Sequence, residues 1–389
     1  MAKRFRQGLV VIGGSLAQKP DFGGLTWVFL QLVLGFKRLG WDVVFLDRLE
    51  PEMCVDASGA QCSFESSVNV RYLAEIMAHY GLSDAFALAG EGYQRFIGLT
   101  RTQILERMRR ADFFLSVMGF FADPEIVAAA RHHVFYDIDP GFTQMWHELG
   151  LANLLQDQDD FVTVGENIGR PDCSIPTCGR EWIITRHPVV LDQWPVANET
   201  DNGYFTDLGA WRGPTGPVEY RGKTYGLRVH EFRKFVALPR LTGEKFEIAF
   251  DIHPAEVKDL ALLAENNWRV VEPKAAASGP IAYRNYLSTS RAQFMVAKGM
   301  YVQSNSGLVS DRCACYLASG KPVLAQDTGF SRHYRTGTGL IAFSSLEEAR
   351  VGATEIARDY GKHCQAARAI AEEYFDSNKV LAELITKLA

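Results

Sequence analysis

The sequence lacks long apolar segments. No uninterrupted apolar stretch in the 389 residues reaches the ~18 residues that a bilayer-spanning helix needs. The basic opening MAKRFRQ is followed only by a short apolar run, Leu9 to Ile12, which is too short for the core of a signal peptide. We therefore expect a soluble, cytoplasmic protein without an integral membrane segment.

An excess of positive charge is also missing. The formal net charge is -5, the isoelectric point is near 6.0, and no long run of lysine or arginine occurs. Proteins that take DNA or RNA as their main partner present a strongly basic surface. Nucleic acid is therefore not an expected partner.

The cysteines do not form the patterns of metal or disulfide proteins. Seven cysteines in a chain of this length, an odd number, are typical of reduced thiols. Cys173 and Cys178, and likewise Cys313 and Cys315, are not the matched CxxC pairs of a zinc site. We expect no metal site and buried or surface thiols instead.

Length and composition favour two α/β domains. The chain exceeds the ~150 residues of a typical domain, and 47% hydrophobic residues are enough for two cores. Over residues 8–47 an apolar run, glycines, a helical pattern and a second apolar run predict a β-α-β unit. Because similar units recur, we expect two tandem Rossmann-like, doubly wound domains with a cleft between them.

The expected domains span residues 1–200 and 201–370, joined by the polar stretch Ala197 to Asn202, and residues 371–389 form a C-terminal helix that packs back on the first domain. In the first domain we expect strands at 8–12, 41–46, 112–118, 133–138, 161–165 and 181–185, and helices at 25–39, 68–79 and 124–131. In the second we expect strands at 204–210, 245–250, 268–271, 293–296 and 322–326, and helices at 230–238, 254–266, 283–287 and 311–318.

The segment Ser304-Asn-Ser-Gly-Leu-Val-Ser-Asp-Arg312 is suited to bind an anion. In an open parallel sheet, ligands lie beyond the carboxyl ends of the strands, and anions lie at helix N-termini. Ser304 and Ser306 offer hydroxyls, and Gly307 lets a phosphate approach the backbone. Serine, asparagine and glycine are also ordinary helix caps, so the residues alone leave both interpretations open.

A longer stretch carries a family resemblance. Ser304 and Gly307, followed by Tyr316-Leu-Ala-Ser-Gly-Lys-Pro-Val-Leu-Ala-Gln-Asp-Thr-Gly-Phe330, resemble the C-terminal signature of GT-B glycosyltransferases. The resemblance is strongest over residues 268–345 and weaker over 8–47. It implies metal-independent transfer of a sugar from a nucleotide-diphosphate sugar, with no other cofactor, to a small-molecule or glycan acceptor on the first domain. It places Ser306, Gly307, Leu308 and Val309 at the diphosphate, and Gly329 and Phe330 near the sugar.

The sequence departs from the common retaining family of this fold. That family carries two glutamates eight positions apart, and this sequence has Gly307 and Cys315 in their places. The ribose contact of the second glutamate would have to move, and Asp311 in the first helical turn is the candidate. Retention of configuration therefore does not follow from the resemblance.

Three further residues are candidates for the donor site. Arg212 and Gly213 follow the strand Phe205 to Ala210, where the resemblance implies a turn beside the phosphates. Arg212 either pairs with a phosphate or is an ordinary surface arginine. Tyr283 either stacks on the nucleobase or fills the core.

Two carboxylates are candidates for the catalytic base. Asp139 and Asp137 come at the carboxyl end of the strand His133 to Ile138. Either can deprotonate an acceptor if burial raises its pKa, although Asp139-Pro-Gly is also a common turn sequence. Asp139 is the first choice, Asp137 the second, and His187 a third candidate that is alternatively structural.

Two glycine pairs mark the acceptor side of the expected cleft. Gly13-Gly14 and Gly23-Gly24 either let a substrate approach the first strand or close tight turns. Their spacing is not the G-x-G-x-x-G fingerprint, which disfavours a nicotinamide-dependent enzyme. A nucleotide-sugar epimerase or hydrolase on the same fold is the alternative to a transferase.

Overall fold

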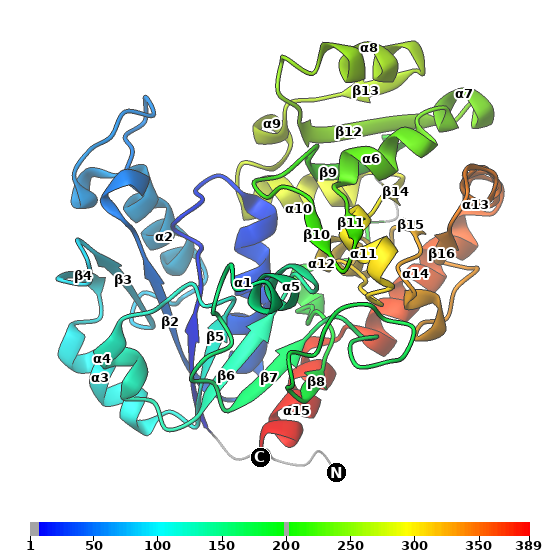
Figure 1. Cartoon of the computed structure of the whole chain (residues 1–389). Coiled ribbons are helices and arrows are strands. Elements are labelled where there is room, and N and C mark those ends of the chain that lie inside the picture. Colours follow the sequence, from blue (N-terminus) through cyan, green and yellow to red (C-terminus); the bar gives the residue numbers. More distant parts are fainter. Residues whose placement is uncertain (1–7, 198–201) are drawn as a thin grey trace.

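The computed structural model describes residues 8–197 and 202–389, and two parallel sheets dominate it (Figure 1). The first sheet has the order β4-β3-β2-β1-β5-β6-β7-β8, and only β3 and β4 pair antiparallel. Its strands are β1 (Leu9–Gly13), β2 (Asp42–Arg48), β3 (Phe86–Gly90), β4 (Arg95–Gly98), β5 (Phe113–Val117), β6 (His133–Asp137), β7 (Asp160–Thr163) and β8 (Trp182–Ile184). The helices of this half are α1 (Gly23–Arg38), α2 (Val68–His79), α3 (Arg101–Arg110), α4 (Pro124–Ala128) and α5 (Phe142–Glu148).

The second sheet repeats this plan with the order β13-β12-β9-β14-β15-β16, and all its neighbours are parallel. Its strands are β9 (Tyr204–Ala210), β12 (Lys245–Asp251), β13 (Trp268–Val270), β14 (Ala292–Met295), β15 (Val323–Gln326) and β16 (Leu340–Phe343), and a separate hairpin consists of β10 (Val218–Tyr220) and β11 (Lys223–Tyr225). The helices are α6 (Arg228–Phe232), α7 (Leu238–Thr242), α8 (Val257–Glu265), α9 (Pro273–Ala277), α10 (Pro280–Thr289), α11 (Gly299–Ser304), α12 (Asp311–Ala318), α13 (Leu346–Arg358), α14 (Tyr360–Tyr374) and α15 (Ser377–Leu388). Short 3-10 turns lie at Pro51–Met53, Phe64–Ser66, Leu191–Gln193, Arg233–Phe235 and Phe330–Arg332.

Both sheets confirm the predicted fold class. The strand order reverses between β1 and β5 and again between β9 and β14, as in a doubly wound fold. The central strands form from continuous apolar runs because both of their faces are covered: Val10, Val11 and Ile12 are all fully buried.

Several predicted elements differ from the structure. The continuous helix expected over 230–238 is wrong, because the chain forms α6, a 3-10 turn and then α7, which has Pro239 in its first turn. Proline lacks the N–H that a longer helix would need there. Strand β3 was not predicted, since its sequence Phe86–Gly90 is rich in alanine and glycine. Hairpin β10–β11, helix α11 and strand β16 were also missed.

The C-terminal tail packs on the first domain, as predicted. Helix α15 lies against α1, where a Cβ added to Gly35 would come within 2.6 Å of Leu381, and Figure 1 shows α15 near β8 of the first sheet. The chain returns after α14 through a bridge between Val189 and Asp376. Residues 198–201 of the predicted linker lie outside the described residues, so the domain limits 1–200, 201–370 and 371–389 stay predictions.

Leu381→Ala tests this docking. Leu381 is fully buried on α15, so its truncation should lower the free energy of unfolding by about 2–5 kcal/mol in denaturant titrations. Val351→Ala in α13 is the control, because Val351 is 44% exposed and its loss should change stability by less than about 0.5 kcal/mol. Equal effects of the two substitutions would contradict the docking of α15 as a stabilising contact.

A buried carboxylate fixes the loop between β1 and α1. Asp47, at the end of β2, accepts hydrogen bonds from the backbone N–H groups of Ala17 (2.6 Å) and Arg48 (2.7 Å) and from Nε2 of Gln18 (3.1 Å). Burial raises the pKa of Asp47 from its usual 3.8 to about 7, and the hydrogen bonds offset only part of this. The folded protein therefore holds a proton here that the unfolded chain has already lost.

Asp47→Asn should change how stability depends on pH. Because the folded pKa is raised, the contribution of Asp47 is fully present below about pH 4 and is lost as the pH rises to about 7. The free energy of unfolding of the wild type, relative to the variant, should fall across this window by up to about 1.4 kcal/mol per pH unit. A difference that stays constant with pH would show that Asp47 does not titrate in this range.

Candidate functional site

A pocket lies at the carboxyl ends of β14 and β15, beside the point where the order of the second sheet reverses. Ligands of open α/β sheets bind at this position. Its volume is about 20 Å³, far below that of a typical small-molecule site. We call it the strand-end pocket, and its lining residues are Arg228, Met295, Ala297, Lys298, Tyr301, Leu308, Ser310 and Thr328.

Ion pairs surround the strand-end pocket. Asp207 on β9 is fully buried and accepts from Nη1 of Arg312 at 2.6 Å, while Nη1 of Arg228 lies 3.5 Å from its other oxygen. Lys298 pairs with Asp139 of the first domain at 3.0 Å. The lining cations Arg228 and Lys298 therefore each lie beside a carboxylate, and Arg312, which shares Asp207 with Arg228, also lies within the field of Asp311. Such cations can pair with an anionic ligand.

The N-terminus of α12 adds to this positive potential. Ser310 caps the helix, because its hydroxyl accepts from the backbone N–H of Cys313 at 3.3 Å. The other first-turn N–H groups have no partner within the helix, and the positive end of the helix dipole lies at the same place. Ser310 and Leu308 both line the strand-end pocket, so guanidinium, ammonium and helix terminus converge on one small space.

The two candidate carboxylates lie in different environments. Asp139 is half-buried at the domain interface and accepts from Lys298 and from the hydroxyl of Tyr301. Asp137 is fully buried and accepts from Gln144 (2.7 Å) and Thr163 (2.8 Å). Burial raises the pKa of Asp137 to about 6, although both hydrogen bonds lower it. In this arrangement Asp139 lies beside the strand-end pocket and Asp137 is closed off from it.

One residue of the first domain joins it to the predicted phosphate segment. The side-chain amide of Asn167 donates to the carbonyl of Asn305 (3.0 Å) and accepts from Nε2 of His333 (2.8 Å). Its backbone N–H donates to the carbonyl of Ser306 at 3.1 Å. We call these contacts the Asn167 seam.

Ser304, Ser306 and Gly307 lie at the contact between the domains, and their predicted roles at the diphosphate stay predictions. Both serines are fully buried, and the hydroxyl of Ser306 accepts from the N–H of Leu308. Gly307 has a φ of +76°, and a Cβ added there would lie 2.9 Å from Asn167. The glycine therefore admits a neighbouring domain rather than exposing backbone to the strand-end pocket.

Val309, predicted at the diphosphate, and Gly329 and Phe330, predicted near the sugar, are also packed. Phe330 is fully buried and Val309 nearly so. Gly329 has a φ of +91°, and a Cβ added there would lie 2.0 Å from the side chain of Asn305. These residues are therefore packed inside the protein. Of the residues predicted to contact the diphosphate, only Leu308 lines the strand-end pocket.

The other donor candidates lie away from this pocket. Arg212 forms an ion pair with Glu256 and is 44% exposed, and Gly213, with a φ of +84°, has open space around it. Tyr283 is buried and packs edge-on against Trp194. These positions agree with a core role for Tyr283 and with Arg212 as a surface arginine.

The four glycines of the acceptor side allow close packing. A Cβ added to Gly23 would lie 2.3 Å from the carbonyl oxygen of Gly279, and one added to Gly24 would meet Tyr283. These two glycines thus bring α1 of the first domain against α10 of the second. Gly13 and Gly14 pack against phenylalanine rings inside the first domain.

His187 and Asp311 share a second, smaller cavity. This cavity lies between α1 and α12 and has no lining residue in common with the strand-end pocket. Burial lowers the pKa of His187 below its usual 6.5, while Asp311 partly offsets this. Neither residue therefore meets the strand-end pocket in this arrangement.

Sequence reasoning missed Arg228, Lys298 and Asn167 as site residues. Lys298 had a usable signal, because it directly follows the apolar run of β14 at the carboxyl end of a strand. Arg228 begins a short helix, and Asn167 lies in a loop 138 residues before its partner Asn305. Neither position has a distinctive sequence pattern.

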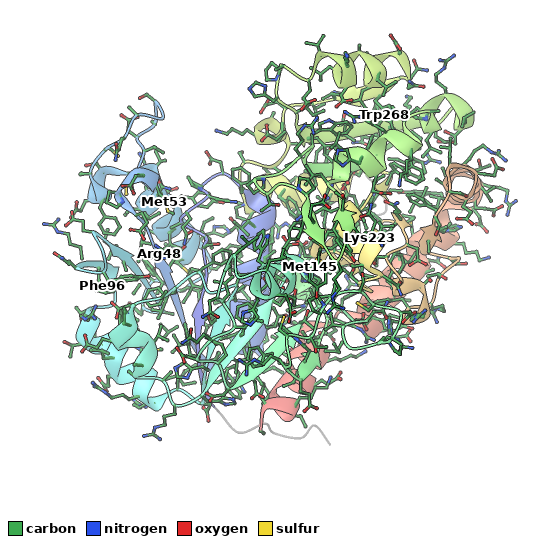
Figure 2. All side chains as sticks on the ribbon, viewed as in Figure 1. Arg48, Met53, Phe96, Met145, Lys223 and Trp268 are labelled. Carbon is green, nitrogen blue, oxygen red and sulfur yellow. The ribbon has the colours of Figure 1, made fainter. Side chains whose placement is uncertain are left out.

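Side chains fill the junction between the domains. Met145 of α5, labelled in Figure 2, belongs to one buried cluster with Tyr220 and Tyr225 of the β10–β11 hairpin and Met300 of α11.

Within residues 8–197 and 202–389, no helix is long and apolar enough to span a bilayer, and no group of three or more metal-ligating side chains gathers. None of the seven cysteines, all of which belong to the described residues, forms a disulfide bond.

No protein-family model matches the sequence, and no curated protein sequence does. Among solved structures, the chain is similar to an α-glucosyltransferase in complex with UDP, with a TM-score of 0.60 and 11% identity over 98% of this chain and 100% of that one. The same α-glucosyltransferase is also known with UDP and a 13-mer DNA. AviGT4, a glycosyltransferase involved in avilamycin A biosynthesis, gives a TM-score of 0.57 at 11% identity. The match covers 98% of this chain and 97% of that one.

Alr3699/HepE from Anabaena, in complex with UDP-glucose, gives a TM-score of 0.56 at 11% identity, over 98% of this chain and all of that one. All these similarities span both sheets, and at such low identity they describe the architecture. The chain therefore has the fold of the GT-B glycosyltransferases over nearly its whole length.

Proposed function

We propose that the protein is a glycosyltransferase that moves a sugar from a nucleotide-diphosphate sugar to a small-molecule or glycan acceptor, without a metal ion. The observation that carries the proposal is the strand-end pocket. Arg228, Lys298 and the N-terminus of α12 line it together at the carboxyl ends of parallel strands. A leaving diphosphate gains negative charge, and fixed positive groups stabilise such charge without reorganisation. The UDP and UDP-glucose complexes of similar folds make UDP the first nucleotide to test.

Binding of this donor requires the domains to separate. The strand-end pocket, with about 20 Å³, cannot hold a nucleotide-sugar. Lys298 is meanwhile occupied by Asp139 of the first domain. When the cleft opens and then closes around the donor, the diphosphate would replace Asp139 as the partner of Lys298. Asp139 would then be free to accept a proton from the acceptor.

The first domain also carries a larger cavity of about 580 Å³, which we call the loop pocket and which offers room for the part of an acceptor remote from Asp139. It lies between the β1–α1 loop, residues 55–59 and α2 of the first domain, and Lys274 of the second. Its charged lining residues are Asp21, Asp56, Glu75, Arg71 and Lys274, and its one aromatic is Tyr72. Three acids against two bases favour a small polar or glycan acceptor over a DNA strand.

Lys298→Ala tests the donor site. Losing one charge-assisted hydrogen bond to phosphate should weaken UDP binding about 10- to 100-fold in calorimetry. Arg212→Ala is the matched control, because Arg212 is paired with Glu256 off the strand-end pocket and should leave the affinity within about twofold. Wild-type affinity in Lys298→Ala would contradict the assignment. A wild type that consumes the donor alone and rapidly would favour an epimerase or hydrolase.

Asp139→Asn tests the proposed base. Asparagine keeps the shape but accepts no proton, so kcat should fall about 10²- to 10⁴-fold, while UDP affinity should rise by at most about fivefold because asparagine competes less for Lys298. Asp137→Asn serves for comparison, because Asp137 is sealed by Gln144 and Thr163 and its loss should affect stability more than kcat. The opposite pattern, with kcat lost only in Asp137→Asn, would overturn the choice of base.

A further inference from the structure

A turn of the first domain holds two cysteines opposite each other. Val55 and Gln61 form an isolated antiparallel bridge, and Cys54 and Cys62 are the next pair outward along the same two segments. The N–H of Cys62 donates to the carbonyl of Cys54 at 3.0 Å. Opposed residues of an antiparallel pair have side chains on one face and, where hydrogen-bonded, Cα atoms about 5.5 Å apart. The two thiols are therefore neighbours in space.

Burial shows which way the two side chains point. Cys54 is 2% exposed, and Cys62 is half-buried although the residues on either side of it are exposed. Both thiols thus lie on the inner face of the turn. Burial raises the pKa of the Cys54 thiol, and the nearby Cys62 raises it further. Cys62 is therefore the thiol that a reagent in solution reaches first, and Cys54 is shielded.

Weak contacts hold the two sulfur atoms. Sγ of Cys54 donates to the carbonyl of Glu50 at 3.6 Å, and Sγ of Cys62 donates to the carbonyl of Ser63 at 3.5 Å. Thiols are weak hydrogen-bond donors. These contacts therefore oppose a change of side-chain rotamer only weakly.

The backbone spacing of the turn suits a disulfide. Disulfides join Cα atoms about 4.4–6.8 Å apart and Cβ atoms about 3.5–4.5 Å apart. Opposed Cβ atoms lie about 4.5–5.5 Å apart, so the two segments have to approach each other by roughly 1 Å. Pairing here is limited to one bridge, which lets them do so. A disulfide closed against such strain is readily reduced again.

The other cysteines that are close in sequence are arranged differently. Cys173 packs against one buried cluster and Cys178 against another, and Sγ of Cys178 donates to the carbonyl of Gln144. Cys313 and Cys315 are buried two positions apart on α12, so their side chains point in different directions. Backbone pairing thus sets the cysteines of the turn apart from these two pairs.

We propose that Cys54 and Cys62 form a reversible disulfide by exchange with a small disulfide of the glutathione type. The Cys62 thiolate attacks one sulfur of that reagent, whose S–S bond breaks and releases one thiolate. The Cys54 thiolate then attacks Sγ of Cys62, which closes the protein disulfide and releases the second thiolate. The two thiol protons of the protein end on the released thiolates, so the protein loses two electrons and the reagent gains two. The proposal does not depend on the glycosyltransferase function.

The disulfide would enclose one wall of the loop pocket. Residues 55–59, between the two cysteines, line that pocket. The carbonyl of Val55 also accepts from the N–H of Val68 at 2.8 Å, and its N–H donates to the side chain of Asn69 at 3.3 Å, both at the start of α2. A link across the turn therefore restricts a segment that joins the pocket to α2, and opening of the turn should become rarer.

Peptide mapping of the folded full chain tests the link. Between Arg48 and Arg71 the sequence has no lysine or arginine, so trypsin releases one peptide, residues 49–71, that contains both cysteines. After incubation with oxidised glutathione and blocking of the remaining thiols with N-ethylmaleimide, this peptide should be unlabelled and two hydrogen atoms lighter. Dithiothreitol before blocking should restore two labels. The peptide with Cys173 and Cys178 is the internal control and should contain no such link.

Single substitutions separate the roles of the two thiols. In Cys54→Ser the exchange should stop at the mixed disulfide, so the peptide should carry one glutathione on Cys62. In Cys62→Ser the buried Cys54 should react at least about tenfold more slowly. Circular dichroism of each variant establishes that it is folded. In the wild type, hydrogen exchange of residues 55–61 should be slower after oxidation.

Three outcomes would overturn the proposal. The first is a dithiol or mixed-disulfide peptide in the wild type after prolonged exchange, which would show that the sulfur atoms do not meet. The second is a link that forms only in urea-unfolded protein. The third is equal linkage of Cys173 with Cys178, which would show that the reaction does not select the turn. None of these readouts involves UDP, so a failure of the proposed donor site leaves the test intact.

Discussion

The side-chain amide of Asn167 fastens one domain to the other, and the geometry of the site depends on it. From one loop of the first domain, Asn167 bonds to Asn305, Ser306 and His333, which lie on two separate loops of the second. The left-handed Gly307 gives it room. Because Gly307 also donates to the carbonyl of Thr328, the seam sets the position of the two loops that flank the strand-end pocket.

Asp139 compensates positive charge at the strand-end pocket from the opposite domain. Bringing Arg228, Arg312 and Lys298 together would be costly if their charges were uncompensated, and Asp139 from the opposite domain supplies the missing carboxylate. Its side chain is 35% exposed, so the pair with Lys298 contributes only about 0.2–1 kcal/mol. A diphosphate, with more charge and more acceptor oxygens, can displace a partner held so weakly.

The sequence predicted the fold well because its signals are local. Apolar runs such as Val10 to Ile12 identify buried parallel strands by themselves. The roles of the site residues do not follow from the sequence alone, because a loop rich in serine and glycine has the same sequence whether it faces a phosphate or another domain. Ser306 and Gly307 face Asn167, and Gly23 faces Gly279, both contacts between residues far apart in the chain. Only the tertiary arrangement decides between those alternatives.

Asp137, the last residue of β6, and Asp139, just after it, show how tertiary packing gives two similar residues different environments. Asp137 and Asp139 are two positions apart, yet only Asp139 reaches the partner domain. The pKa of Asp137, raised to about 6 by burial, is by itself the better match to a general base near neutral pH. Proton transfer also requires hydrogen-bond contact with the acceptor, and both oxygens of Asp137 already accept hydrogen bonds, one from Gln144 and Thr163 and the other from the backbone N–H of Asp139. The contact geometry therefore decides more than the pKa does. Asp139 is the better candidate for the catalytic base when Lys298 is paired with a phosphate.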